Sequence, residues 1–183
     1  MNENKTYCGW KDSALTEKGL RHIRALAERL KEEKVGLIVS SDLDRTVTTS
    51  KAILEFHKAE YITTKELREM CFGIWEGMNY DEINHHYPME AQRWQEDWKD
   101  YIIPEGESLR QMYERVTQYT EHLMHSYHGQ TILIVTHGGS IRAMLAHLIG
   151  RGLEDYWRYK VVHGRITRIE ILEGFPVLAE LNA

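Results

Sequence analysis

One segment of the sequence ends an apolar run with residues suited to hold an anion. Residues 131–135 (TILIV) read as a buried strand, and His137, Gly138 and Gly139 follow just before a predicted helix. Glycines let the backbone approach a ligand, and the first N–H groups of a helix lack partners within that helix. A protonated His137 would add a donor. The pattern favours a phosphate site over the alternative, a glycine-rich turn with a structural histidine.

A second segment has the same layout and contributes an arginine. The apolar residues 37–39 lead into residues 40–45 (SSDLDR), so Arg45 falls in the first turn of the next predicted helix. A cation there opposes the helix dipole unless an anion is bound, and the planar guanidinium matches the geometry of a phosphate. Ligands in α/β sheets gather at the carboxyl ends of the strands. We therefore expect Arg45 and His137 to converge on one phosphate pocket.

A carboxylate with an apolar setting supplies the third candidate. Glu69 follows a predicted short strand and lies in residues 67–77 (LREMCFGIWEG), among apolar and aromatic neighbours. Loss of solvent raises the pKa of a carboxyl group, and a raised pKa suits a general acid near neutral pH. The alternative is that Glu69 and Glu76 are surface charges or partners of Arg68.

The elements that must position these residues alternate between helix and strand. Hydrophobic periodicity predicts a helix from Thr16 to about Lys34, with Thr16 as its N-cap, and Ser108 with Gln111 forms a capping-box pattern. The other predicted elements are helices 43–57, 109–127 and 140–149, strands 35–39, 61–64 and 131–135, and a closing hairpin at 167–181. This order predicts an α/β fold with helices on both faces of a parallel or mixed sheet.

The aromatic-rich segment of about 75–107 interrupts this alternation. No repeat, linker or change in composition marks a second domain, so we expect one domain over residues 1–183 with this insertion as a cap. Trp94, Trp98 and Tyr101 recur at helical spacing. Their packing on the core is favoured over a stacking platform for a flat aromatic base.

Composition excludes several classes of protein. The chain has 183 residues, a formal net charge of -5 and 42% hydrophobic residues, enough for a core. Its basic residues are scattered, which argues against nucleic acid as a partner. No apolar run reaches the roughly 20 residues of a membrane span, and no signal-peptide pattern occurs, so we expect a cytoplasmic protein with no membrane partner. Cys8 and Cys71 are expected to be free thiols.

Taken together, the motifs identify a family by resemblance. Five blocks occur in the family's order: residues 9–19 (GWKDSALTEKG), 40–45 (SSDLDR), 67–77, 106–108 (GES) and 136–139 (THGG). In this order they resemble the histidine phosphatases of the phosphoglycerate mutase-like superfamily. The resemblance implies a three-layer α/β/α sandwich with a mixed, mostly parallel sheet, and phosphoryl transfer through a phosphohistidine without cofactor or metal.

The resemblance also assigns roles to individual positions. It implies that Arg45 and His137 clamp the oxygens of the phosphoryl group, while Glu69 protonates the leaving group and then activates water. This agrees with the physics, because phosphoryl transfer depends mainly on positioning and charge stabilisation. The remaining residues implied to line the phosphate pocket are Asn2, Cys8, Gly9 and Gly138.

One family motif does not occur. The resemblance places the nucleophile in an Arg-His-Gly motif after a first strand, just ahead of Met1 if Asn2 matches the family's asparagine, and no such tripeptide precedes Gly9. His22 and His163 lie in different contexts. We therefore predict that the chain as written lacks the first strand and the attacking histidine, and gives no phosphatase turnover. It is either a shortened phosphatase or a non-catalytic protein.

Further motifs indicate the substrate. Residues 77–83, 87–88, 104–108 and 175–178 most resemble α-ribazole phosphatases of cobalamin biosynthesis, so the expected substrate is the small phosphomonoester α-ribazole 5'-phosphate. A broad-specificity phosphatase and a phosphoglycerate mutase-like enzyme are the alternatives within the family. A homodimer is left open.

The residue types also allow two other kinds of site. A serine hydrolase would use Ser140 as its nucleophile, but the Gly-x-Ser-x-Gly elbow is absent. A metal site would use His85 and His86 with Glu82 or Glu90, although adjacent histidines on a helix point about 100° apart.

Overall fold

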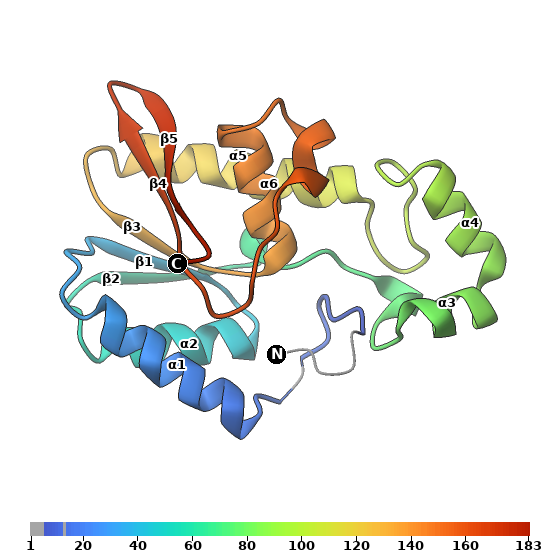
Figure 1. Ribbon diagram of the computed structural model, residues 1–183, viewed down its shortest axis with the longest axis horizontal. Coiled ribbons are helices and arrows are strands. Elements are labelled where there is room, and N and C mark those ends of the chain that lie inside the picture. The colour runs from blue at the N-terminus through green and yellow to red at the C-terminus, as the bar shows by residue number, and fades with distance from the viewer. Residues whose placement is uncertain (1–5, 13) are drawn as a thin grey trace.

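Three parallel strands form the centre of the fold. The structure, a computed structural model, describes residues 6–12 and 14–183 (Figure 1). Strand β1 (Leu37–Ser41) lies between β2 (Glu60–Thr64) and β3 (Ile132–Val135), and both pairings are parallel. The carboxyl ends of all three strands therefore lie at one edge of the sheet, which is the edge predicted to hold the site.

Helices cover both faces of this sheet, as Figure 1 shows. Ile38 points to one face and packs in a cluster with residues of α1 (Glu17–Leu30) and α2 (Asp44–Leu54). Leu37 and Val39 point to the other face and pack with residues of α5 (Leu109–Ser126) and α6 (Gly138–Leu148). All five residues of β1 are buried because both faces are covered. The predicted three-layer α/β/α arrangement is confirmed.

Local signals set the starts of two helices. Thr16 is the N-cap of α1, and its side chain accepts a hydrogen bond from the N–H of Gly19. Ser108 and Gln111 form the predicted capping box at the start of α5. Such caps satisfy N–H groups that have no partner within the helix. Both helix starts could therefore be predicted from the sequence.

The C-terminal hairpin differs from the prediction. Strands β4 (Thr167–Leu172) and β5 (Phe175–Leu181) pair with each other in a separate two-stranded antiparallel sheet. In the described part of the chain, β3 pairs with β1 alone, so the hairpin does not close the central sheet, and β3 is an edge strand with half-buried residues. Within residues 6–12 and 14–36 no strand is formed.

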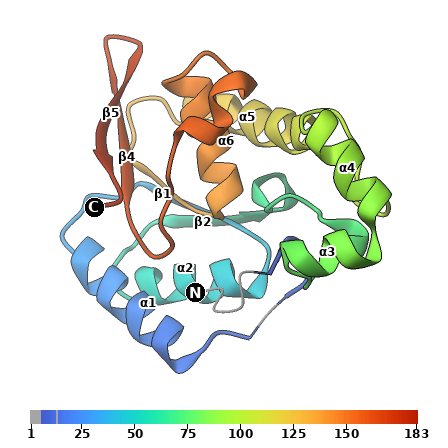
Figure 2. The same ribbon diagram turned by 45° about the vertical axis from the view of Figure 1, so that its right-hand side comes forward.

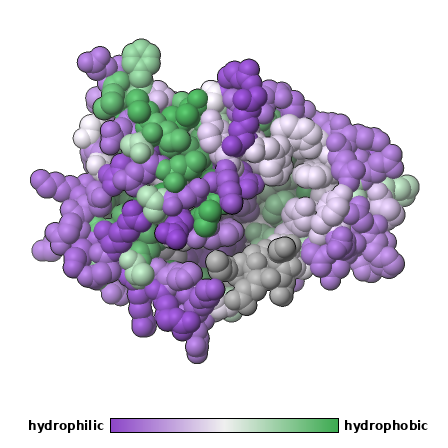
Figure 3. All heavy atoms as spheres, viewed as in Figure 1, coloured by the Kyte–Doolittle hydropathy of each residue, from purple (hydrophilic) through white to green (hydrophobic). Residues whose placement is uncertain are grey.

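The apolar side of β5 faces outward. Phe175 is 73% exposed and Val177 42%, whereas Pro176 and Leu178 are half-buried. Side chains alternate across a strand, so only one side of β5 can contact the rest of the protein. Figure 3 shows apolar side chains gathered over the hairpin.

None of the helices in the part of the chain that the structure describes has the length and apolar character that a membrane span needs.

The segment between β2 and α5 carries two short helices, α3 (Tyr80–His86) and α4 (Pro88–Glu96), set to one side of the sheet (Figure 2). The helix predicted through Tyr101 ends at Glu96 instead. Trp94 packs edge-on against Trp75, and Tyr101 stacks on the same ring. These contacts with the buried Trp75 support the predicted packing role of the two aromatic residues.

Candidate active site

Arg45 and His137 meet at the carboxyl edge of the sheet. Arg45 lies in the first turn of α2, after β1, and His137 is the residue directly before α6, after β3. The Nε of Arg45 donates a hydrogen bond to Nδ1 of His137 at 3.2 Å, although the two residues are 92 positions apart. The parallel pairing of β1 with β3 therefore produces the juxtaposition that we expected of a phosphate pocket.

The guanidinium of Arg45 is also held by the N-terminal segment. Its Nη2 donates to the carbonyl of Gly9 at 2.5 Å, Nη1 donates to the carbonyl of Lys11, and Asp12 lies 3.7 Å from Nη1. Burial lowers the pKa of Arg45, while Asp12 and Glu69 act in the opposite direction. An arginine stays protonated in proteins, so a fixed positive charge lies at the site.

His137 is a neutral imidazole in this arrangement. Because Arg45 donates to its Nδ1, the ring proton is on Nε2, which donates to Oγ of Ser41 at 2.7 Å. Burial, and next the charge of Arg45, lower the pKa of His137 to about 3. The ring is therefore a neutral donor through Nε2, and not the cationic donor that the sequence suggests. A bound phosphate dianion would raise this pKa.

Glu69 lies against the start of α6. Its Oε2 accepts a hydrogen bond from the N–H of Gly139 at 2.8 Å, and Oε1 accepts one from the N–H of Met70 at 3.0 Å. Burial raises its pKa, although both N–H groups and Arg45 oppose the shift. Arg68 pairs instead with Asp42 through two hydrogen bonds of 2.6 and 2.7 Å. Glu69 is thus an enclosed carboxyl group without a direct ion pair to Arg68.

Glu76, the second carboxylate of the segment 67–77, has a structural role. Glu76 accepts hydrogen bonds from the N–H groups of Gly9 and Trp10 at 3.0 and 2.8 Å. A Cβ on Gly9 would collide with the carbonyl of Met70, so this close approach of two backbones requires glycine. Glu76 therefore holds the segment whose Gly9 carbonyl binds Arg45.

The structure describes only some of the other residues predicted to line the phosphate pocket. Asn2 lies outside the described residues. Cys8 is half-buried and lies near enough to Arg45 to affect the pKa of the Arg45 guanidinium. Gly138 is the first residue of α6. Cys8 and Cys71 are both free thiols. The roles assigned to Asn2, Cys8, Gly9 and Gly138 stay predictions.

His163 lies beside the site, although the sequence predicts no role for it. A Cβ built on Gly138 would lie 3.9 Å from Cε1 of His163, and burial lowers the pKa of this histidine. The loop that carries His163 is held by Arg142 of α6, whose Nε donates to the carbonyl of Tyr159 at 3.0 Å. The His-Gly pair at 163–164, just ahead of the hairpin, was the only signal in the sequence.

The structure does not support the two alternative sites. Ser140 is fully buried, and its hydroxyl donates to the carbonyl of Arg68 at 3.0 Å, so it is not accessible as a nucleophile. Within residues 6–12 and 14–183, no group of three or more His, Cys, Asp or Glu side chains could hold a metal ion. His85 and His86 are exposed and pack edge to face.

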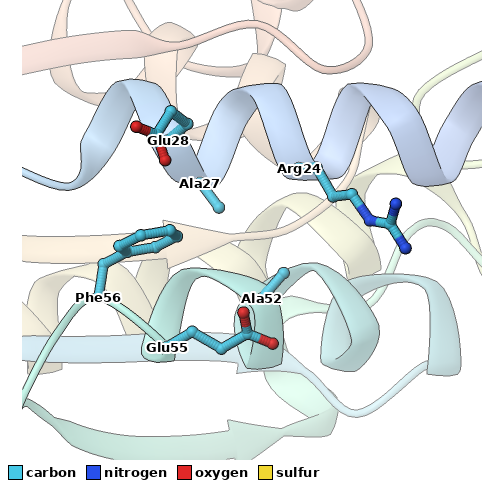
Figure 4. A pocket seen from close by; sticks show the side chains of 6 residues that line it. All are labelled: Arg24, Ala27, Glu28, Ala52, Glu55 and Phe56. Atoms are coloured by element: carbon cyan, nitrogen blue, oxygen red, sulfur yellow. The ribbon is translucent and has the colours of Figure 1, made fainter.

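A hollow elsewhere on the surface is unsuited to phosphate. It has a volume of about 280 Å³ and lies between α1 and α2, as Figure 4 shows. Its lining residues are Arg24, Ala27, Glu28, Ala52, Glu55 and Phe56. None of them is a predicted site residue, and two carboxylates would repel an anion.

Comparison with known proteins agrees with the resemblance. The histidine phosphatase superfamily (branch 1) matches residues 1–183. Phosphoserine phosphatase 1 of Hydrogenobacter thermophilus is 32% identical over 176 residues, which are 96% of this chain and 83% of that protein. The adenosylcobalamin/alpha-ribazole phosphatase of Escherichia coli is 29% identical over 182 residues, 100% of this chain and 90% of that protein.

A solved structure gives the same result. The crystal structure of the alpha-ribazole phosphatase from Shigella flexneri has a TM-score of 0.91 and 30% identity, and the match covers 100% of this chain and 90% of that one. The α/β fold and the five sequence motifs thus agree with a match over the whole chain. The chain belongs to branch 1 of the histidine phosphatase superfamily and is, by family, a phosphoric monoester hydrolase.

Proposed function

We propose that this site serves the hydrolysis of a small phosphomonoester: Arg45 and His137 hold the phosphoryl group, Glu69 moves the proton, and an imidazole other than that of His137 makes the attack. The observation that carries the proposal is the convergence of these residues: Arg45 hydrogen-bonds to His137 at the end of two neighbouring strands, and Glu69 is enclosed against α6. A fixed cation, a helix N-terminus and a carboxyl group with a raised pKa suit phosphoryl transfer.

Phosphate binding changes the hydrogen-bond partners of Arg45 and His137. A phosphate oxygen is a stronger acceptor than the Gly9 carbonyl or the neutral Nδ1 of His137, so it replaces them as a partner of Arg45. The negative charge then favours protonation of His137, which becomes a second cationic donor. The pocket therefore gains charge complementarity when phosphate enters.

The reaction follows the double displacement of the family. An imidazole nitrogen attacks phosphorus, the phosphorus–oxygen ester bond breaks, and the leaving oxygen takes the proton of Glu69. The Glu69 carboxylate then removes a proton from water, which attacks phosphorus and releases the imidazole and inorganic phosphate. His137 is unsuited to the attack because its imidazole is protonated once phosphate is bound, and a protonated imidazole has no free lone pair. The family's Arg-His-Gly motif does not occur in the sequence.

Free imidazole can therefore serve as a test. The chain as written should release no phosphate from p-nitrophenyl phosphate on its own, and excess imidazole should start release by supplying the missing attacking group. Arg45→Met should abolish the rescued release, while Arg24→Met, in the hollow between α1 and α2, should not. Release without imidazole, or rescued release that survives Arg45→Met, would contradict the proposal. The in-frame codons ahead of Met1 would show whether an Arg-His-Gly motif is encoded there.

For the substrate we propose α-ribazole 5'-phosphate. The support is the set of motifs at 77–83, 87–88, 104–108 and 175–178, together with the similarity to proteins named alpha-ribazole phosphatase. Phosphoserine is the second candidate because a relative 32% identical to this chain is named phosphoserine phosphatase 1. In the imidazole-rescued assay, α-ribazole 5'-phosphate should exceed phosphoserine in kcat/KM by about 100-fold, a ratio that pocket contacts can supply. The reverse order would favour phosphoserine.

A further inference from the structure

An arginine of α5 is bonded to the main chain that leads to Glu69. Nη1 of Arg115 donates to three carbonyl oxygens, those of Lys65 at 3.2 Å, Glu66 at 2.8 Å and Arg68 at 3.1 Å. Its Nη2 also lies 3.5 Å from the carbonyl of Glu69. Lys65 and Glu66 belong to the 3-10 helix η1 (Lys65–Leu67), in which the carbonyl of Lys65 also accepts a hydrogen bond from the N–H of Arg68 at 3.0 Å. Arg115 thereby fixes the chain just before Glu69.

Glu107 holds the chain on the other side. Its Oε1 accepts a hydrogen bond from Nη2 of Arg115 at 2.7 Å and another from the N–H of Cys71 at 2.8 Å. The side chains of Arg115 and Glu107 are only 15% and 14% exposed. One ion pair, largely shielded from water, thus bonds to main-chain groups before and after Glu69.

Two further contacts connect the Arg115–Glu107 ion pair, here called the clamp, to the site. The hydroxyl of Ser140 in α6 donates to the carbonyl of Arg68, which Arg115 also binds, and Thr136 donates to the carbonyl of Leu67 at 2.6 Å. The same short segment is therefore bonded to α5 on one side and to the start of α6 on the other. Its position determines where the Glu69 carboxylate lies relative to α6.

We propose that Arg115 and Glu107 are positioning residues that hold the main chain on both sides of Glu69, so that its carboxylate stays against the N–H of Gly139 at the phosphate site. The inference rests on the proposed role of Glu69 as the proton-transfer group. Arg115 acts on Glu69 through the backbone: among the described residues, its hydrogen bonds go to main-chain carbonyls and to Glu107. Its charge also contributes to lowering the pKa of His137.

The clamp has a measurable consequence at Glu69. Burial is the main reason that the pKa of Glu69 is raised. Its N–H partners Gly139 and Met70, and the charges of Arg45 and Arg142, oppose that shift. If the segment were released, water would reach the carboxylate, and the pKa would fall toward the ordinary glutamate value of about 4.3. A displacement of about 1 Å at a reacting group can cost on the order of 100-fold in rate.

The test is the titration of the Glu69 carboxyl group, followed by carbon-13 NMR in protein labelled at glutamate and assigned with Glu69→Gln. Arg115→Met removes every donor but keeps an apolar stem, and it should lower the pKa of Glu69. Arg110→Met is the matched control, because Arg110 lies on the same helix and pairs with the exposed Asp100, and it should leave the titration unchanged. Arg115→Lys should give an intermediate value.

Folding is checked by circular dichroism for each variant. If Arg115→Met does not fold, Arg115→Lys and Glu107→Ala take its place, and one of them must lower the pKa of Glu69. A folded Arg115→Met protein in which Glu69 titrates as in the parent would overturn the inference. So would an equal shift in Arg110→Met.

Turnover is measured separately, in the imidazole-rescued assay. Arg115→Met should lower kcat about 100-fold with little change in KM, because substrate binding by Arg45 and His137 is retained. A rise in KM with kcat unchanged would contradict the positioning role, because it would mean that Arg115 contributes to substrate binding. The NMR titration needs no turnover, so failure of the proposed hydrolysis and failure of the clamp are distinguishable.

Discussion

The N–H of Gly139 donates a hydrogen bond of 2.8 Å to Oε2 of Glu69, and this contact joins the segment after η1 to the first turn of α6. The two residues are 70 positions apart. The bond places a carboxyl group with a raised pKa beside the helix N-terminus that the sequence predicts to bind phosphate. The proton-transfer group and the anion site therefore share one structural support.

The substitution Gly139→Ala should disturb both the Glu69 carboxyl group and the N-terminus of α6. A Cβ at this position would collide with Oε1 of Glu69 and lie 2.9 Å from the hydroxyl oxygen of Tyr156. We expect the free energy of unfolding to fall by about 2 kcal/mol, as for other overpacked sites. Urea denaturation measures this, with Gly138→Ala as the control, since among residues 6–12 and 14–183 a Cβ there meets only Cε1 of His163 at 3.9 Å. Equal losses in the two variants would contradict the prediction.

His137 should make stability depend on pH. Its pKa is lowered to about 3 in the folded protein, against about 6.5 in the unfolded chain. The unfolded state therefore binds more protons, so the contribution of His137 is fully present above pH 6.5 and is lost as the pH falls toward 3. The slope contributed is at most about 1.4 kcal/mol per pH unit.

Urea midpoints between pH 7.5 and 5 test this slope. His137→Gln should reduce it, whereas His22→Gln, on the exposed face of α1, should leave it as in the parent. Inorganic phosphate should also reduce the slope in the parent, because a bound anion favours the protonated ring. A slope that is the same in the His137→Gln protein would show that other groups are responsible.

Arg45 should dominate phosphate binding. Arg45→Met removes the fixed charge and the planar donors, and we expect the thermal stabilisation by inorganic phosphate or vanadate to disappear. Arg45→Lys keeps a charge without the fork and should bind about tenfold more weakly than the parent. The control is Arg24→Met, since Arg24 lines the hollow between α1 and α2. Undiminished stabilisation of Arg45→Met by phosphate would place the anion elsewhere.

The outward side of β5 should affect association more than stability. Phe175 is 73% exposed, so Phe175→Lys should change the free energy of unfolding by no more than about 0.5 kcal/mol. The same change places a charge within an apolar patch and should reduce self-association at high concentration. Sedimentation velocity measures the association, and Glu173→Lys at the hairpin turn is the control. A large loss of stability in Phe175→Lys would show that this face is packed.

Short-range signals predicted most of the fold. Thr16 and Ser108 marked the starts of α1 and α5, and the apolar run at 35–39 marked β1, because caps and hydrophobic periodicity act over a few residues. The hairpin was also predicted as an element. Its place beside the sheet was not, since strand pairing between distant segments leaves no local trace in a sequence.

For the candidate site, too, the sequence predicts some properties and the tertiary structure decides the others. The sequence by itself determined the family, the residue types and their positions at strand ends: Arg45 after β1 and His137 after β3. Only the tertiary structure decided that burial, and next the charge of Arg45, keep His137 neutral, and that Glu69 is enclosed with its backbone held by Arg115. Those properties depend on burial and on hydrogen bonds between residues tens of positions apart, which exist only once the sheet has brought the segments together.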